Sequence, residues 1–234
     1  MKKVYNPYDK NSIANRWIKF ITDREIPGTN PHREFLTILE NWNADFSNYS
    51  LLDIGCGSGI YSNHRAIKRF KNYTGIDSSE TLISYAQENY ENDKVEFFRS
   101  SVYDLPFEDE SFDFLISINV WMHLKNIRLA AKECNRVLKK NSFFAIMTVD
   151  PDQLETWLNW RGEIIEKRED FFYGKWKLKN DFGEVDYGKH YYLNLNLKEL
   201  IESFEVHNLK ILHTNNHTDC RIVIVGQKIG DKND

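Results

Sequence analysis

The stretch that decides the fold is LLDIGCGSGIYS, which runs from Leu51 to Ser62. In it an apolar run ends in an acid, and three glycines follow at alternate positions: Gly55, Gly57 and Gly59. A short apolar run bounded by glycines predicts a buried strand that ends in a tight turn. Glycine lets backbone N–H groups approach a ligand closely, so we expect an anion or nucleotide loop that leads into an amphipathic helix.

Two neighbouring residues indicate which ligand the loop suits. A dinucleotide fingerprint requires a further glycine three places after the second one, where this chain has Ile60. Asp53 stands two places before Gly55, and its carboxylate would repel a pyrophosphate. The pattern therefore favours a ligand that carries a positive group near the turn, such as an ammonium.

A second acid, Asp77, ends the next predicted strand in YTGIDSSETL. In a parallel sheet the tip of this strand lies beside the first loop, and a carboxylate there can accept both hydroxyls of an unphosphorylated ribose. The run from Asp77 to Glu80 is also typical of a capping box at the start of a helix. Both roles can hold, with the backbone of Ser78 serving the cap while the carboxylate faces the cleft.

Short apolar runs alternate with helical patterns between about residues 50 and 150, which predicts repeated βαβ units and a largely parallel sheet. Strands are expected at 51–53, 73–77, 95–98, 112–118 and 143–149. The helices between them have apolar faces that would cover the sheet. Two more helices, at 12–22 and 33–42, are expected before the first strand.

Composition divides the chain into five parts. We expect an N-terminal helical cover at 1–46, an α/β core at 47–150, an insert at 151–192, the end of the core sheet at 193–229 and a tail at 230–234. The insert is rich in aromatic residues and is interrupted by glycines, which predicts an aromatic-rich helical lid. Apolar runs at 210–213 and 221–225 predict an antiparallel hairpin at the sheet edge.

Length and charge exclude several classes of protein. The chain has 234 residues, of which 41% are hydrophobic, enough for one sizeable core. A formal net charge of -4 argues against a nucleic-acid partner. The three cysteines lack metal-ligand or disulfide spacing, so no metal is expected and a reducing cytoplasm is favoured. No window approaches the ~18 apolar residues of a membrane span, so no membrane partner is expected, and the oligomeric state stays open.

Four motifs in order resemble the class I S-adenosylmethionine-dependent methyltransferases. They are DIGCGSG, GIDSSETL, SSVYDLPFEDESFDFLISINVWMHL and the helix end RVLKKNSFF, and the resemblance covers residues 47–150. It implies a doubly wound, seven-stranded, mostly parallel sheet whose last strand is antiparallel. It also implies that S-adenosylmethionine binds across the carboxyl ends of the first strands.

The resemblance assigns cofactor contacts to individual residues. Asp53 and Gly55 would lie near the methionine amino group, Gly57 and Gly59 would let the loop approach, and Asp77 would hold the ribose. Leu82 would lie against the adenine, and Ser101 and Val102 would contact it. Ser78 is a further candidate for a cofactor contact, and so is Asn119 because of its position at the end of the fourth strand. The family often has an acid where this chain has Ser101, whose hydroxyl accepts a weaker hydrogen bond.

Methyl transfer depends mainly on alignment in a closed pocket, and a general base helps only when the acceptor arrives protonated. His123 follows the fourth strand, Asp150 ends the fifth, and His190 shares a face with Tyr192 in an extended run. All three are candidates for the base. Each also has a plain alternative, since His123 could bind a loop carbonyl, Asp150 could be an N-cap and His190 could be exposed to solvent.

The aromatic residues of the insert are expected either to line the floor of a substrate pocket or to form the packed core of a small lid. They are Trp157, Trp160, Phe171, Phe172, Tyr173 and Trp176. As a set they indicate an insert that closes over something apolar. Tyr5, Tyr8 and Trp17 are candidates for the other half of that cover.

The favoured interpretation is a methyltransferase that transfers a methyl group by in-line displacement to oxygen, nitrogen or carbon of a small organic acceptor, with aromatic acceptors included. The alternatives are a cofactor-binding regulatory module, a synthase without methyl transfer, and a methyltransferase directed at a macromolecule. Nucleobase amines are disfavoured by the acidic balance, and because INVW stands where an Asn-Pro-Pro-aromatic motif would be required.

Overall fold

The computed structural model describes residues 14–15, 18, 31–180, 183–216 and 219–230. The helix predicted at 12–22 therefore lies mostly outside the described residues. So do the three aromatic residues proposed for an N-terminal cover, Tyr5, Tyr8 and Trp17.

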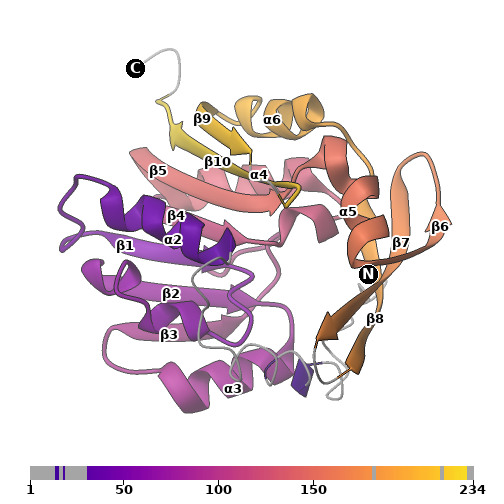
Figure 1. Ribbon diagram of the computed structural model, residues 1–234. Helices are drawn as coiled ribbons and strands as arrows, with labels where there is room; N and C mark the ends of the chain where they lie inside the picture. Colours follow the sequence, from indigo (N-terminus) through magenta and orange to yellow (C-terminus); the bar gives the residue numbers. More distant parts are fainter. Residues whose placement is uncertain (1–13, 16–17, 19–30, 181–182, 217–218, 231–234) are drawn as a thin grey trace.

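The core is one seven-stranded sheet with the order β3-β2-β1-β4-β5-β10-β9 (Figure 1). Its strands are β1 (Ser50–Ile54), β2 (Asn72–Asp77), β3 (Val95–Arg99), β4 (Phe112–Ile118), β5 (Leu138–Val149), β9 (Leu209–Asn216) and β10 (Arg221–Lys228). The five strands from β3 to β5 in this order pair in parallel, whereas β10 runs antiparallel to both β5 and β9. The predicted sheet, its antiparallel last strand and the terminal hairpin are confirmed.

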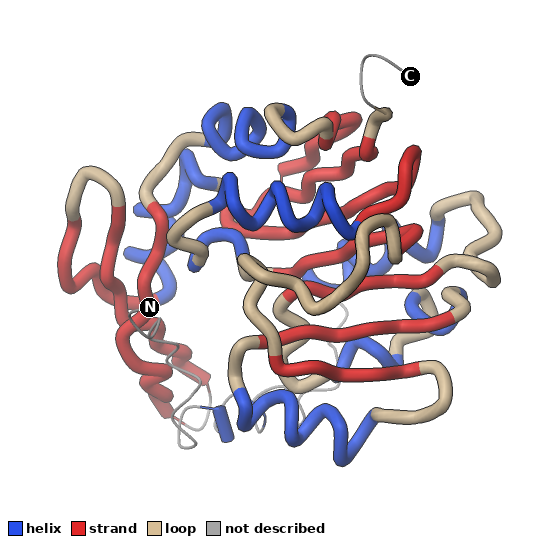
Figure 2. Tube along the Cα trace, turned by 180° about the vertical axis from the view of Figure 1, so that it is seen from behind, coloured by secondary structure: helices blue, strands red, loops and turns tan. Residues whose placement is uncertain are grey.

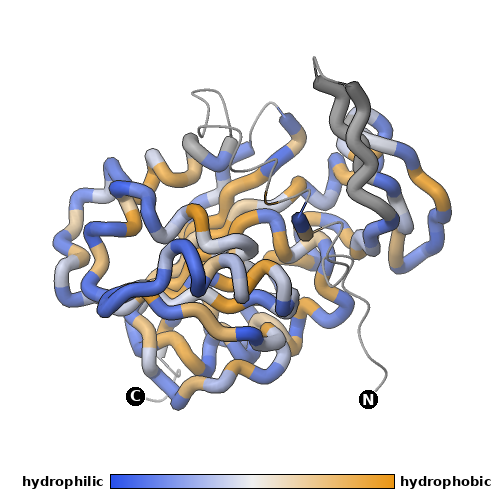
Figure 3. The backbone as a smooth tube through the Cα atoms, turned by 90° about the horizontal axis from the view of Figure 1, so that it is seen from below, coloured by the Kyte–Doolittle hydropathy of each residue, from blue (hydrophilic) through white to orange (hydrophobic). Residues whose placement is uncertain are grey.

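The strands form because their side chains are buried on both faces of the sheet. In β4, Phe114 and Ile116 point into one hydrophobic cluster while Leu115 points into the other, as the period of two requires. The same alternation places Leu51 and Leu52 of β1 on opposite faces. Figure 3 shows the hydrophobic segments gathered in the interior and the hydrophilic ones around it.

Helices cover both faces of this sheet. The helices are α2 (Pro31–Asn41), α3 (Glu80–Tyr90), α4 (Ile127–Val137) and α6 (Leu197–Glu205). Buried apolar side chains of α2 and α3, such as Phe35 and Ala86, belong to one hydrophobic cluster, and those of α4 and α6, such as Ala131 and Phe204, to the other. None of the described helices is both long and apolar enough to cross a membrane.

The segment after the glycines differs from the prediction. Instead of an amphipathic helix, two short 3-10 turns follow, η2 (Ile60–Asn63) and η3 (Ile67–Arg69). His64 interrupts them with an extended backbone, and its ring accepts a hydrogen bond from the backbone N–H of Ala66 at 3.2 Å. A side chain that binds nearby backbone in this way competes with helix formation.

The insert also differs, because it is mostly sheet rather than helix. Only α5 (Leu154–Arg161) is helical, apart from the turn η5 (Pro151–Gln153). It is followed by a three-stranded antiparallel sheet of β6 (Gly162–Lys167), β7 (Phe171–Asn180) and β8 (Gly183–Leu193). This small sheet stands beside the carboxyl side of the core, as Figures 1 and 2 show from opposite sides.

Gly174 has a packing role in the small sheet. A Cβ atom on Gly174 would lie 3.1 Å from a methyl group of Leu158 in α5 and 3.3 Å from the ring of Tyr192. The glycine therefore allows a strand to pack closely under α5 and does not end a helix.

Candidate active site

The loops that follow the parallel strands meet at the carboxyl edge of the core sheet. They are the loops after β1, β2, β3, β4 and β5, and β10 begins at the same edge because Arg221 pairs with Val149. Ligands of open α/β sheets bind at this edge, so the predicted site residues are gathered where a ligand is expected.

The glycine loop is held to β2 by its own backbone. The N–H groups of Gly55 and Cys56 donate to the carbonyl of Ile76 at 2.8 and 2.9 Å. All three glycines of the loop have left-handed backbone, with φ of 72° at Gly55, 57° at Gly57 and 76° at Gly59. These conformations explain the glycines physically, since other residues adopt them at a cost.

Close packing adds a second reason for two of the glycines. A Cβ atom on Gly55 would lie 2.2 Å from a methyl carbon of Val120, which follows β4. One on Gly59 would lie 2.7 Å from the ring of Phe97. Because these two residues have no side chain, the loop can pack closely against Val120 after β4 and against Phe97 of β3. The sequence alone did not reveal this need for close packing.

Asp77 joins the glycine loop to the start of α3. One carboxylate oxygen accepts the N–H of Gly57 at 3.1 Å, and the other accepts the N–H of Ser79 at 2.9 Å. The helix itself is capped by Ser79, whose hydroxyl accepts the N–H of Leu82 at 3.4 Å. Asp77 therefore lies at the strand tip beside the loop, and the cap of α3 falls to Ser79.

Asp53, two residues before Gly55, is buried, with 1% of the residue exposed. The hydroxyl of Tyr73 donates to it at 2.6 Å. Burial raises the pKa of Asp53 to about 7, with the negative charge of Asp77 adding to the effect and the Tyr73 hydrogen bond opposing it. A cation bound near Asp53 would restore its charged form.

The residues predicted at the adenine lie around the ends of β3 and α3. The hydroxyl of Ser101 accepts the N–H of Tyr103 at 3.2 Å, and its side chain is exposed. Val102 and Leu82 are buried. The carbonyl of Ser78 accepts a hydrogen bond from Arg99 at 3.2 Å.

A chain of polar side chains crosses the edge beside the glycine loop. Asn119, with a left-handed φ of 59°, binds a ring nitrogen of His32 at 2.7 Å and the guanidinium of Arg221 at 3.2 Å. The other ring nitrogen of His32 binds the hydroxyl of Tyr61. Burial and, to a smaller extent, the positive charge of Arg221 lower the pKa of His32 to about 3. Among these hydrogen-bonded side chains the sequence predicted only Asn119 as a site residue, because its partners come from distant segments.

The two histidine candidates meet at the insert. The ring centroids of His123 and His190 are 5.8 Å apart, and Tyr192 is 4.8 Å from His123. The Nδ1 atom of His123 binds the carbonyl of Tyr191 at 2.7 Å. Burial lowers the pKa of His123 to about 4, and the neighbouring His190 adds to this effect. The structure therefore brings together two candidates that the sequence placed separately, His123 after the fourth strand and His190 in the insert.

Asp150 has the structure of an N-cap. Its carboxylate oxygens accept the N–H of Asp152 at 3.1 Å and the side-chain amide of Gln153 at 3.2 Å. The side chain is buried. Of the two roles considered for Asp150, general base and N-cap, the structure shows the N-cap.

The aromatic residues of the insert divide between its faces. Trp157, Phe172 and Tyr192 are buried in a cluster that includes Val149 of the core. Phe171 and Tyr173 form a second group with Tyr191 on the other side of the strands, with centroid distances from 5.1 to 5.9 Å. Trp160 is exposed, and the side chain of Trp176 lies outside the described part.

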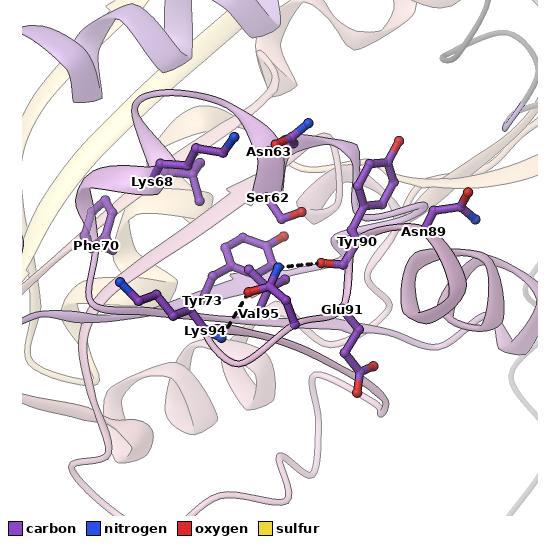
Figure 4. A pocket seen from close by; sticks show the side chains of 12 residues that line it. Ser62, Asn63, Lys68, Phe70, Tyr73, Asn89, Tyr90, Glu91, Lys94 and Val95 are labelled. Carbon is purple, nitrogen blue, oxygen red and sulfur yellow. Dashed lines mark hydrogen bonds between the residues drawn. The ribbon is translucent and has the colours of Figure 1, made fainter.

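A hollow of about 510 Å³ lies at the opposite edge of the sheet (Figure 4). Its lining includes Lys68, Tyr90 and Lys94, at the amino ends of β2 and β3. Parallel strands direct their carboxyl ends away from it, so it is separate from the predicted site. Within the described ranges, no three His, Cys, Asp or Glu side chains gather as metal ligands would.

Known proteins resemble this chain over its core. The family described as "Methyltransferase domain" matches residues 52–146. An O-methyltransferase of Aspergillus nomiae, rstn1, is 36% identical over 100 residues, which are 41% of this chain and 44% of that protein. The ubiquinone biosynthesis O-methyltransferase of Rickettsia akari is 31% identical over 117 residues, 48% of this chain and 45% of that protein. The match thus spans less than half the length of these relatives.

Solved structures extend the likeness to most of the fold. A SAM-dependent methyltransferase of Methanosarcina mazei has a TM-score of 0.62 and 22% identity, and the match covers 83% of this chain and 98% of that one. An S-adenosylmethionine-dependent methyltransferase of Clostridium acetobutylicum has a TM-score of 0.65 and 15% identity, covering 94% and 99%. Residues 52–146 thus match the methyltransferase-domain family, and the described chain has the fold of these S-adenosylmethionine-dependent methyltransferases.

Proposed function

We propose that this protein binds S-adenosylmethionine at the carboxyl edge of the core sheet and transfers its methyl group to a small organic acceptor. The observation that carries the proposal is the placement of Asp77 at the tip of β2, bound to Gly57 of the glycine loop. The methyltransferase family match over residues 52–146 supports the reaction type. The relatives named as O-methyltransferases favour oxygen over nitrogen or carbon as the methylated atom.

The residues of this edge fit the cofactor chemically. Asp77 is half-buried at a strand tip, where a carboxylate can accept ribose hydroxyls. Asp53 has a raised pKa and gains its charge when an ammonium lies nearby. Ser101 offers an exposed hydroxyl beside the end of β3. When bound, the cofactor supplies a sulfonium-linked methyl group open to in-line displacement.

His123 is the best candidate for accepting a proton from the acceptor. A carbonyl can only accept hydrogen bonds, so the contact with Tyr191 places the ring proton on Nδ1 and leaves a lone pair on Nε2. The lowered pKa keeps the ring neutral near pH 7. A hydroxyl acceptor could therefore lose its proton to Nε2 as the oxygen attacks the methyl carbon.

The other two candidates are less well placed for this role. Asp150 uses its carboxylate oxygens to cap η5, as the bonds to Asp152 and Gln153 indicate. His190 is buried beside His123, where it supports the position of that ring. We assign both to positioning and His123 to proton transfer.

Partners and compartment follow from the same features. We expect a small-molecule acceptor because the insert buries Trp157, Phe172 and Tyr192 next to the end of β5. We also expect a cytoplasmic protein, since Cys56, Cys134 and Cys220 are buried and form no disulfide in the described part of the chain, as a reducing compartment permits.

Equilibrium binding and product release test the proposal together. Calorimetry should detect binding of S-adenosylmethionine, and Asp77→Ala should weaken it by about 1 to 3 kcal/mol through lost hydrogen bonds. Glu80→Ala is a matched control, because Glu80 starts the same helix but pairs with Arg99 at the surface. Release of S-adenosylhomocysteine should follow addition of phenols and phenolic acids.

The outcomes separate the alternatives. Binding without turnover on any acceptor would favour a regulatory module over an enzyme. Absence of binding in the wild-type protein, or equal binding by Asp77→Ala, would contradict the assignment of this edge to the cofactor.

A further inference from the structure

The polar chain beside the glycine loop connects four segments of the fold. His32 comes from the start of α2, Tyr61 from η2, Asn119 from the end of β4 and Arg221 from the start of β10. Its members are buried or half-buried, and the charge of Arg221 acts on both His32 and Tyr61. The donor and the acceptor of each hydrogen bond in this series of side chains can be assigned from their chemistry.

The assignment begins at Arg221, whose guanidinium can only donate. The atom of Asn119 that faces it is therefore the oxygen, at 3.2 Å from Nε. The amide nitrogen of Asn119 then faces His32 and donates to Nε2 at 2.7 Å. Because Nε2 accepts, the ring is neutral and carries its proton on Nδ1, which donates to the hydroxyl oxygen of Tyr61.

This assignment leaves the hydroxyl hydrogen of Tyr61 available as a donor. Its oxygen already accepts from His32, and no acceptor for the hydrogen occurs among the described residues. Arg221 is in a similar state, because Nε binds Asn119 and Nη1 binds Asp219, while Nη2 has no bound acceptor in the described ranges. Two donors thus remain at one edge of the sheet.

The surroundings of these donors indicate an anionic oxygen ligand. The guanidinium of Arg221 is buried, and its carbon lies 6.0 Å from the ring centre of Trp157 in the insert. A buried, planar group with a donor to spare suits a carboxylate better than water. Asp53 acts electrostatically on Tyr61, so a site for an ammonium adjoins the donors.

We propose that the Tyr61 hydroxyl and the Arg221 guanidinium form a carboxylate-binding pair, oriented by the hydrogen bonds through His32 and Asn119. The inference rests on the proposed function and deepens it. The carboxylate could come from the amino-acid end of the cofactor or from an acid group on the methyl acceptor, and the same chemistry recognises both. Tyr61 and Arg221 then determine specificity, while His32 and Asn119 are positioning residues.

The test compares two ligands that differ at the amino-acid end. Dissociation constants are measured for S-adenosylhomocysteine and for 5′-methylthioadenosine, which lacks the carboxylate, with wild-type protein, Tyr61→Phe and Arg221→Lys. Tyr90→Phe is the matched control, since Tyr90 lies at the opposite edge of the sheet, in the wall of the hollow. Thermal unfolding confirms that each variant is folded.

If the cofactor supplies the carboxylate, Tyr61→Phe weakens binding of S-adenosylhomocysteine by about 10- to 100-fold and leaves 5′-methylthioadenosine within about twofold. If the acceptor supplies it, both dissociation constants stay at the wild-type value, while KM rises for phenolic acids and not for phenols without the acid. Arg221→Lys should follow the same pattern, because lysine keeps the charge but loses the planar fork.

Equal weakening of both ligands would indicate a structural role for Tyr61 and would overturn the pair. No change for either ligand or any acceptor would overturn it as well. If the wild-type protein binds neither nucleoside, the proposed function itself fails, and that outcome is distinct from the first two.

Discussion

Asp53 makes the stability of this protein depend on pH. Burial raises the pKa of Asp53 to about 7, whereas an unfolded aspartate titrates near pH ~3.9. Between these values the folded chain holds a proton that the unfolded chain has released, so stability falls as pH rises from about 4 to about 7. Above pH 7 the cost of the buried charge is complete.

We therefore expect Asp53→Asn to be more stable than wild type at pH 8, on the order of 1 to 4 kcal/mol, and similar at pH 4. The amide oxygen can still accept the hydroxyl of Tyr73. Urea unfolding at a series of pH values measures the difference. Asp93→Asn, at an exposed position, is the control, and parallel pH profiles for wild type and Asp53→Asn would contradict the role of Asp53.

His123 gives a prediction about turnover. His123→Gln should lower kcat for hydroxyl acceptors by about 10²-fold or more while the dissociation constant for S-adenosylmethionine stays the same. In the wild type, burial lowers the pKa of His123 to about 4, so activity should rise with pH through about 4 and then level off. Rates of S-adenosylhomocysteine release from pH 4 to pH 8 provide the measurement. A rate unchanged by His123→Gln would return the role to Asp150 or His190.

At the scale of elements, the glycine loop is constrained both by its left-handed backbone and by close packing. Gly55→Ala adds a Cβ atom 2.2 Å from Val120 and forces alanine into a φ of 72°, so we expect a loss of about 2 to 4 kcal/mol of unfolding free energy. The double variant Gly55→Ala with Val120→Ala should recover the part due to the clash and retain the part due to φ. Chemical denaturation of the wild type, Gly55→Ala and the double variant separates these two contributions. Equal stability of the single and double variants would exclude the contact with Val120 as the cause.

The core elements could be predicted from sequence because each is encoded locally. The apolar run 112–118 matches β4, and the strand expected at 73–77 differs from β2 by one residue. The turns η2 and η3 and the sheet β6-β7-β8 could not be predicted in the same way. His64 and Gly174 look like ordinary helix and loop residues until their contacts with Ala66 and Leu158 are known.

At the scale of the whole molecule, one hydrophobic cluster fastens the insert to the core. Phe172 and Tyr192 of the small sheet pack with Trp157 of α5 and with Val149 at the end of β5. This cluster between the insert and the core is small compared with the two hydrophobic clusters of the core sheet. Removing one large side chain should therefore release the insert before it unfolds the core.

We expect Phe172→Ala to speed amide hydrogen exchange in β6, β7 and β8 by more than about tenfold, with β1, β4 and β5 unchanged. Trp160→Ala is the control, because that side chain is 60% exposed. Exchange measured by mass spectrometry resolves these segments. A uniform increase across the core would show that the insert and the core unfold as one unit.

The candidate site was predictable in part for a related reason. Asp53 and Asp77 lie at the carboxyl ends of β1 and β2, and Asn119 follows β4. The parallel sheet brings these strand ends together whatever the loops contain. The pairing of His123 with His190 depends instead on how the insert folds back. The bond between Tyr61 and His32 joins residues 29 positions apart, and no local pattern encodes it.

The position of β10 has a consequence for biosynthesis. This strand lies between β5 and β9, yet it is encoded after both of them. During translation, β5 therefore presents an open hydrogen-bonding margin until residues 221–228 have left the ribosome. A nascent chain stalled before that point should bind chaperones at β5. Once β10 has left the ribosome and paired with β5, the chaperones should dissociate.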